Sequence, residues 1–244
     1  MRVRAALVAL ALPSLAYAAH PFVTEDPGTQ GKGKIELELG FGAFRGDPSI
    51  PGRNAIFSPQ LSLGVADDVD LIAQVARVEQ TPTEGPTLIG QGSVLLDVKW
   101  RFKETDRYAL GVRAGLDVPT GDGSDGLGSG QLGAHAIGIA ALTLDEYAVY
   151  ANAVYVYTRQ PGTRRNLGGF SIALTRPDDR PLRGFVEAAM YSNTDPARSQ
   201  WPAFARVGAI YSVTSWLDVD AGIQARLNGA ASRVALLLGA TLRW

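Results

Sequence analysis

Side chains suited to catalysis are scarce in this sequence of 244 residues. It contains two histidines, His20 and His135, and no cysteine. A lipid hydrolase needs a histidine, a serine and a polar group that orients the histidine, but the residue two places after His135 is Ile137. Two histidines also argue against a zinc or iron site built on histidine. We therefore expect no enzyme activity, no catalytic residues, no metal and no cofactor.

Two glycine-rich stretches resemble ligand-binding loops but lack the context that such loops need. Residues 31–34 read Gly-Lys-Gly-Lys and are followed by Ile35 and a strand-like run. A phosphate-binding P-loop instead has Ser or Thr after the lysine, and a helix begins there. Residues 121–126 match neither the spacing of an EF-hand nor that of a calcium-binding β-roll. We interpret the second stretch as a surface loop.

The charged side chains recur at every second position within long runs. In residues 217–227 the odd positions are apolar, whereas the even positions include two aspartates and an arginine. Successive side chains of a strand point to opposite faces, so each run has an apolar face and a charged face. The charged residues that this alternation assigns to an inner, lumen-lining face are Glu36, Glu38, Asp70, Asp97, Lys99, Arg101, Arg113, Asp117, Glu187, Arg206, Asp218, Asp220 and Arg226.

These inward charges allow two interpretations. Charges inside a narrow barrel must be paired or hydrated, because burying an isolated charge is costly. Paired charges could brace the wall as a ladder of ion pairs. Alternatively, opposed charges could line a narrow polar path and set the preference for a solute.

The runs predict twelve strands that together form an all-β protein. Most of them have the length that a tilted strand needs to cross a bilayer, about 9–11 residues, whereas strands of soluble proteins average about 5–6. In three runs (130–142, 182–192 and 203–213), small residues occur on both faces, so the sequence does not decide which face points into the barrel. The expected strands are 34–44, 54–65, 69–78, 90–102, 108–118, 130–142, 147–158, 167–175, 182–192, 203–213, 217–227 and 233–244.

Short and long connections alternate along the chain. The connections after the even-numbered runs are short, whereas those after the odd-numbered runs are mostly longer. This arrangement is typical of a single antiparallel transmembrane β-barrel with short periplasmic turns and longer extracellular loops. A water-soluble barrel with its apolar stripes turned inward is the alternative fold. Strand length, loop alternation and the charged face favour the membrane barrel.

The first residues predict export. Arg2 and Arg4 precede a short apolar run, and residues 16–18 form an Ala-Tyr-Ala cleavage site. We expect a cleaved signal peptide at 1–18, a periplasmic or lumenal segment at 19–33 and the barrel at 34–244, located in the bacterial outer membrane. The mean hydropathy of +0.03 is too low for a helical membrane protein, and the net charge of −1 argues against nucleic-acid binding.

The last run resembles the closing strand of bacterial outer-membrane barrels. An apolar stripe ends on a terminal aromatic, and the resemblance implies that the barrel-assembly machinery recognises this segment. We expect it to pair with run 217–227 and to close the sheet against run 34–44. The stripe includes Leu236, Leu238, Leu242 and Trp244.

Three local patterns carry a more specific resemblance. They are residues 20–26 (His-Pro-Phe-Val-Thr-Glu-Asp) with the following 28–34, residues 116–122 (Leu-Asp-Val-Pro-Thr-Gly-Asp), and the terminal aromatic strand. Together they resemble the transporter-like outer-membrane proteins of the meta-pathway phenol-degradation family. That resemblance spans the mature chain and implies a barrel that takes up small aromatic or other hydrophobic compounds.

Three functions are therefore compared. The leading hypothesis is a narrow outer-membrane channel or transporter for small, aromatic or hydrophobic solutes. The alternative is a plugged barrel with a structural or surface-interaction role, and a lipid hydrolase is the least favoured. Expected partners are the solute, the barrel-assembly machinery, outer-membrane lipids and lipopolysaccharide. The phosphates of lipopolysaccharide could pair with a cluster of loop arginines, Arg159, Arg164 and Arg165. The sequence does not determine the oligomeric state.

Overall fold

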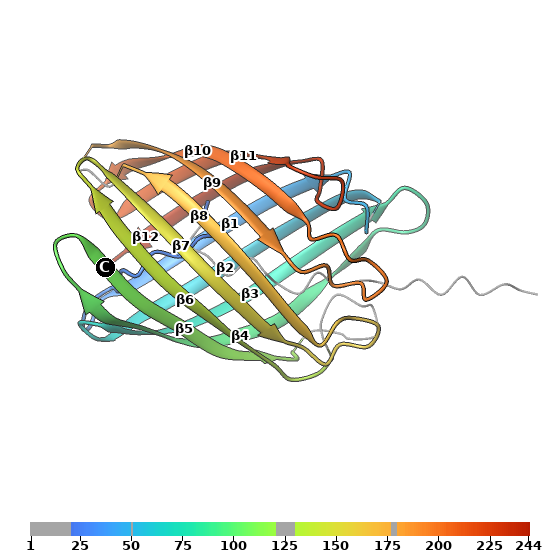
Figure 1. Ribbon diagram of the computed structural model, residues 1–244, viewed down its shortest axis with the longest axis horizontal. Helices are drawn as coiled ribbons and strands as arrows, with labels where there is room; N and C mark the ends of the chain where they lie inside the picture. Colours follow the sequence, from blue (N-terminus) through green and yellow to red (C-terminus); the bar gives the residue numbers. More distant parts are fainter. Residues whose placement is uncertain (1–20, 50, 121–129, 177–179) are drawn as a thin grey trace, which may run out of the picture.

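The protein is a closed antiparallel β-barrel. The structure, a computed structural model, describes residues 21–49, 51–120, 130–176 and 180–244. Its twelve strands follow one another around the barrel in chain order, and the first pairs with the last (Figure 1). The predicted all-β barrel of twelve antiparallel strands is thus confirmed. The predicted signal peptide and the glycine-rich loop at 121–126 lie outside the described residues.

The strands closely follow the predicted runs. The largest differences are at the β2–β3–β4 hairpins, where pairing continues from Gly52 to Pro82 and from Gln80 to Leu88. The polar residues between Val78 and Gly90 favoured a loop in the sequence, but the strand pairing extends through them. The β3–β4 hairpin therefore projects beyond its neighbours (Figure 1). The strands are β1 (Ile35–Arg45), β2 (Gly52–Ala66), β3 (Val69–Pro82), β4 (Leu88–Glu104), β5 (Tyr108–Val118), β6 (Gly133–Leu144), β7 (Tyr147–Tyr157), β8 (Asn166–Thr175), β9 (Leu182–Tyr191), β10 (Ala203–Thr214), β11 (Leu217–Arg226) and β12 (Val234–Arg243).

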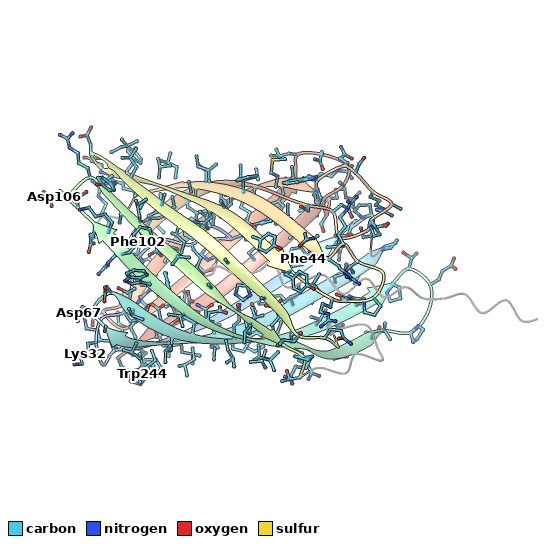
Figure 2. All side chains as sticks on the ribbon, turned by 60° about the horizontal axis from the view of Figure 1, so that its bottom comes forward. Lys32, Phe44, Asp67, Phe102, Asp106 and Trp244 are labelled. Atoms are coloured by element: carbon cyan, nitrogen blue, oxygen red, sulfur yellow. The ribbon has the colours of Figure 1, made fainter. Side chains whose placement is uncertain are left out.

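The two ends of the barrel differ. The short turns lie at the same end as the C-terminus, and Figure 2 shows Lys32, Asp67, Asp106 and Trp244 together at this end, away from Phe44. In outer-membrane barrels the short turns are periplasmic, so we refer to this as the periplasmic end. Among the described residues, no helix has the length and apolar character needed to cross a membrane.

The seam between β1 and β12 closes the sheet. Leu39 lies opposite Ala240 and Phe41 opposite Leu238. At the periplasmic end the backbones of Ile35 and Trp244 exchange two hydrogen bonds of 2.8 and 3.0 Å. Closure leaves no unpaired strand edge, which lipid could not tolerate. The predicted pairing of the terminal strand on both sides is confirmed.

An apolar band encircles the outer wall of the barrel. Leu96, Ile172, Val207 and Ile223 are each at least half exposed although they lie in the middle of the sheet. Exposed apolar side chains on every strand would be unfavourable in water but suit contact with lipid. The polar residues that alternate with them face the interior.

We expect the cost of a charge on this wall to depend on depth. Leu39→Arg, midway along the outward stripe of β1, should lower the free energy of unfolding in phospholipid vesicles by about 2–4 kcal/mol. Leu144→Arg, at the periplasmic end of β6, should cost only about 0–1 kcal/mol. Urea titrations followed by gel mobility without heating would measure both. Equal costs at the two positions would contradict a lipid-facing wall.

Candidate functional site

Residues 21–33, here called the lumen segment, occupy the interior of the barrel. At its inner end the carbonyl of Pro21 accepts a hydrogen bond of 3.1 Å from Arg206 on β10. At the periplasmic rim the amide of Lys32 donates to Asp67, and that of Gly33 donates to the carbonyl of Gly64. The sequence left open whether this segment lies in the lumen or in the periplasm. The structure places it across the lumen.

Wall side chains satisfy the backbone of the lumen segment. The segment has no regular secondary structure, so its buried amides need partners from elsewhere. The carboxylate of Glu187 on β9 accepts from the amides of Val23 and Thr24, at 2.9 and 2.7 Å, and from the hydroxyl of Thr24 at 2.6 Å. Asn152 on β7 accepts from the amide of Glu25 at 2.6 Å and donates to its carbonyl at 2.9 Å.

The side chain of Glu25 lies between two buried cations of the wall. One carboxylate oxygen is 3.1 Å from Nζ of Lys99 on β4, and the other pairs with Nη1 of Arg113 on β5. Their side chains are 2%, 9% and 0% exposed, respectively. Removing one member of such a buried set leaves a charge without compensation, which typically costs about 3–5 kcal/mol. The segment is therefore held by ionic contacts as well as by hydrogen bonds.

The ionic network continues along the wall to β6. Arg113 also pairs with Asp97, at 2.7 Å from its Nε. The ring of His135 lies between two carboxylates, with Nε2 2.9 Å from Asp97 and Nδ1 2.6 Å from Asp117. Both ring nitrogens therefore face carboxylates, so neither is available to activate a serine.

A polar cavity of about 320 Å³ lies beside the segment toward the periplasmic end. Gln30 of the segment lines it, donating to Asp70 at 3.1 Å and to Glu36 at 2.7 Å. Arg243 bridges Glu36 and Asp218 at 2.7 and 2.8 Å. Carboxylates outnumber basic groups, so the lining is acidic: Glu25, Asp26, Glu36, Glu38, Asp70, Asp218 and Asp220 against Lys99, Arg176, Arg183 and Arg243.

Part of the inner wall is apolar, contrary to the charged lumen expected from the sequence. Phe22 of the segment packs on Phe185 with ring centroids 4.3 Å apart, and Val23 packs with Ala189 and Tyr191. A second inward cluster lies on β4 and β6–β8. The sequence pattern that could have indicated an apolar inner wall is the weak alternation in runs 130–142 and 182–192, where both faces carry apolar or small residues. This second cluster consists of Leu95, Ile137, Ile139, Val156 and Leu167.

The charged residues assigned to the lumen are placed as follows. Arg101 is half-buried at the periplasmic rim, where it contacts the carbonyl of Asp67, and Arg226 is exposed at the opposite end. The network around Glu25 brings together Asp97, Lys99, Arg113 and Asp117. The buried members are Glu36, Glu38, Asp70, Asp97, Lys99, Arg113, Asp117, Glu187, Arg206, Asp218 and Asp220. Glu25 and Asn152 could not be recognised from the sequence, because neither lies in a charged alternating stripe.

Neutralising Glu25 should release the lumen segment. The chain has no cysteine, so Val23→Cys, whose native side chain is 7% exposed, reports on the segment without background. In the Val23→Cys background, Glu25→Ala should speed the reaction with a small thiol reagent at least tenfold, because the segment loses both of its ion pairs with the wall, to Lys99 and to Arg113. Asp26→Asn is the matched control, since Asp26 forms no ion pair with the described residues. Equal protection in both variants would contradict an ionic latch.

Comparisons with known structures agree with the fold. A search of curated protein sequences finds no match. An outer membrane channel from Pseudomonas putida F1 has a TM-score of 0.70 and 14% identity, over 90% of this chain and 98% of that chain. The NanC porin has a TM-score of 0.56 and 10% identity, over 85% and 98%. The CymD monoaromatic hydrocarbon channel has a TM-score of 0.51 and 9% identity, over 88% and 90%.

The sequence itself identifies the family. A family model described as "Putative MetA-pathway of phenol degradation" matches residues 20–244. The match covers the lumen segment as well as all twelve strands, so the segment is part of the family pattern. This twelve-stranded outer-membrane barrel belongs to the family of the MetA-pathway of phenol degradation.

Proposed function

We propose that the protein is a narrow outer-membrane channel that its own lumen segment closes at rest. The observation that carries this proposal is the segment lying across the lumen and held by side chains, with Glu25 between Lys99 and Arg113. A wall braced only by its own ion pairs would need no such insert. A segment outside the strand ladder can leave without breaking the sheet.

The solutes that we propose are small and aromatic or hydrophobic. The lumen combines an acidic cavity with apolar inner clusters and the packed rings of Phe22 and Phe185, whose planes are tilted by 45°. Aromatic side chains bind flat rings by stacking or edge contacts. The family description and the likeness to a monoaromatic hydrocarbon channel support the same class.

Two other functions are weighed against the channel. A plugged structural barrel is favoured by the same filled lumen, and only transport measurements separate the two. A lipid hydrolase has little support, because both ring nitrogens of His135 face carboxylates. We therefore propose a non-enzymatic role in the bacterial outer membrane.

A reversible lock tests the channel. Val23 of the segment packs against Ala189 of β9, so Val23→Cys with Ala189→Cys should join the segment to the wall when oxidised. In planar bilayers we expect the oxidised double variant to show at least tenfold less conductance than the wild type, and reduction should restore it.

The outcomes separate the hypotheses. Each single cysteine variant under the same oxidation is the matched control and should conduct like the wild type. Conductance that persists in the locked barrel would show that the segment does not close the lumen. Absence of conductance in both the wild type and the reduced variant would favour the plugged structural barrel.

The proposed solute class makes a separate prediction. In proteoliposomes, benzyltrimethylammonium should enter several-fold faster than tetramethylammonium, because its ring can pack on the apolar inner clusters while both ions carry the same charge. Phe185→Ala should reduce this preference without abolishing conductance. Equal rates for the two ions in the wild type would contradict an aromatic preference.

A further inference from the structure

Two arginines lie directly opposite each other on the outer wall of the barrel. Arg45 at the end of β1 pairs in register with Arg53 on β2, and both side chains are exposed. Their positions alternate with inward Phe44 and Asn54, so both point away from the lumen. The Cβ atoms of directly opposed residues are about 4.5–5.5 Å apart, and like charges at that spacing destabilise a sheet.

No carboxylate among the described residues forms an ion pair with either arginine. Neither guanidinium forms an ion pair or a hydrogen bond with that part of the chain. Glu79 lies on the same outer face, opposite Ala55. It offsets one of the two charges but forms no ion pair within 4.0 Å. An anion from outside the protein would relieve the repulsion.

The height of the pair on the wall identifies the environment of such an anion. Arg45 follows Ile35, at the periplasmic end of β1, by ten positions. At about 3.3 Å per residue and a tilt of about 40°, this is about 25 Å, the height of the apolar band of an outer-membrane barrel. Phe41 and Phe57, paired two rows below, are 37% and 42% exposed and suit the interfacial aromatic girdle. The guanidinia therefore lie at the level of the outer-leaflet head groups.

A groove in the outer wall leads away from the two arginines. It has a volume of about 580 Å³, and Arg45, Arg53 and Glu79 contribute to its lining. Ala43 and Ala55 line it with short side chains that leave room between larger neighbours, and Leu236 lines it farther around the barrel. The groove thus joins a cationic end to an apolar surface, which matches a lipid with an anionic head and acyl chains.

We propose that this groove binds lipopolysaccharide through a phosphate of its lipid A. The phosphate monoester, with close to two negative charges, lies between the guanidinia of Arg45 and Arg53, each of which can form a bidentate contact. An acyl chain lies along Ala43, Ala55 and Leu236. An isolated charge at the membrane rim needs no partner, but a directly opposed pair above an apolar groove fits this lipid.

The site differs from the loop cluster predicted from the sequence. Arg164 donates to the carbonyls of Pro196 and Arg198, at 3.0 and 3.1 Å, and so orders the loops. Arg159 and Arg165 are exposed in the same loop. The lipid-facing pair on β1 and β2 is the better phosphate site because it is fixed by the strand register.

Native mass spectrometry of the detergent-solubilised barrel tests the proposal. The wild type should retain one molecule of bisphosphorylated lipid A, whereas Arg45→Gln with Arg53→Gln should bind it at least tenfold more weakly. Arg45→Lys with Arg53→Lys, which keeps the charge, should retain most of the binding. The matched control, Lys103→Gln with Arg107→Gln, removes the same charge at the periplasmic rim and should bind like the wild type.

Each result bears on the proposal. Gel mobility without heating should show that all variants are folded, and lipid A without phosphate should bind the wild type and the Gln variant equally weakly. Unchanged affinity in the folded Gln variant would overturn the site. Equally tight binding of dephosphorylated lipid A would overturn phosphate recognition, and equally tight binding of phosphatidylglycerol would overturn the choice of lipopolysaccharide.

Discussion

The buried contact of Glu25 with Lys99 and Arg113 is the interaction on which the interior depends. Without it, Lys99 would lose its ion pair within the described part of the chain, and Arg113 would lose one of its two carboxylate partners, Glu25 and Asp97. A buried cation without an adjacent carboxylate is costly in a medium of low dielectric constant. The wall and the lumen segment are therefore complementary.

Sequence predicted the barrel well because a membrane wall imposes a strict period of two. The clearest case is β11, where apolar residues alternate with Asp218, Asp220 and Gln224 and the facing follows directly. The period fails in β6, where Ile137 and Ile139 point inward while small residues face outward. An apolar side chain that points into the barrel cannot be told from one that points to lipid by its residue type. Which face of such a strand points inward is decided by its contacts with neighbouring strands.

The candidate site was only half predictable for a related reason. The wall residues that contact the segment, such as Lys99 and Arg113, lie in alternating strands and could be assigned to the lumen. Their partner Glu25 lies in a proline- and glycine-rich stretch without periodicity. Its placement follows from contacts with residues 74 and 88 positions away. Local sequence patterns contain no information about such distant pairings.

The lumen segment is tied to the sheet by backbone hydrogen bonds at its periplasmic end, whereas wall side chains hold its inner end. Gly33 bonds to Gly64, and two residues later Ile35 joins the closing seam with Trp244. A Cβ on Gly64 would collide with the carbonyl of Gly31, so the backbones touch there. Gly31 and Gly33 have φ of 84° and 81°, and nothing lies within 4 Å of where their Cβ atoms would be. Glycine tolerates such φ values. Because its periplasmic end stays bonded to the strands, a segment freed at Glu25 would remain attached there while the barrel stays closed.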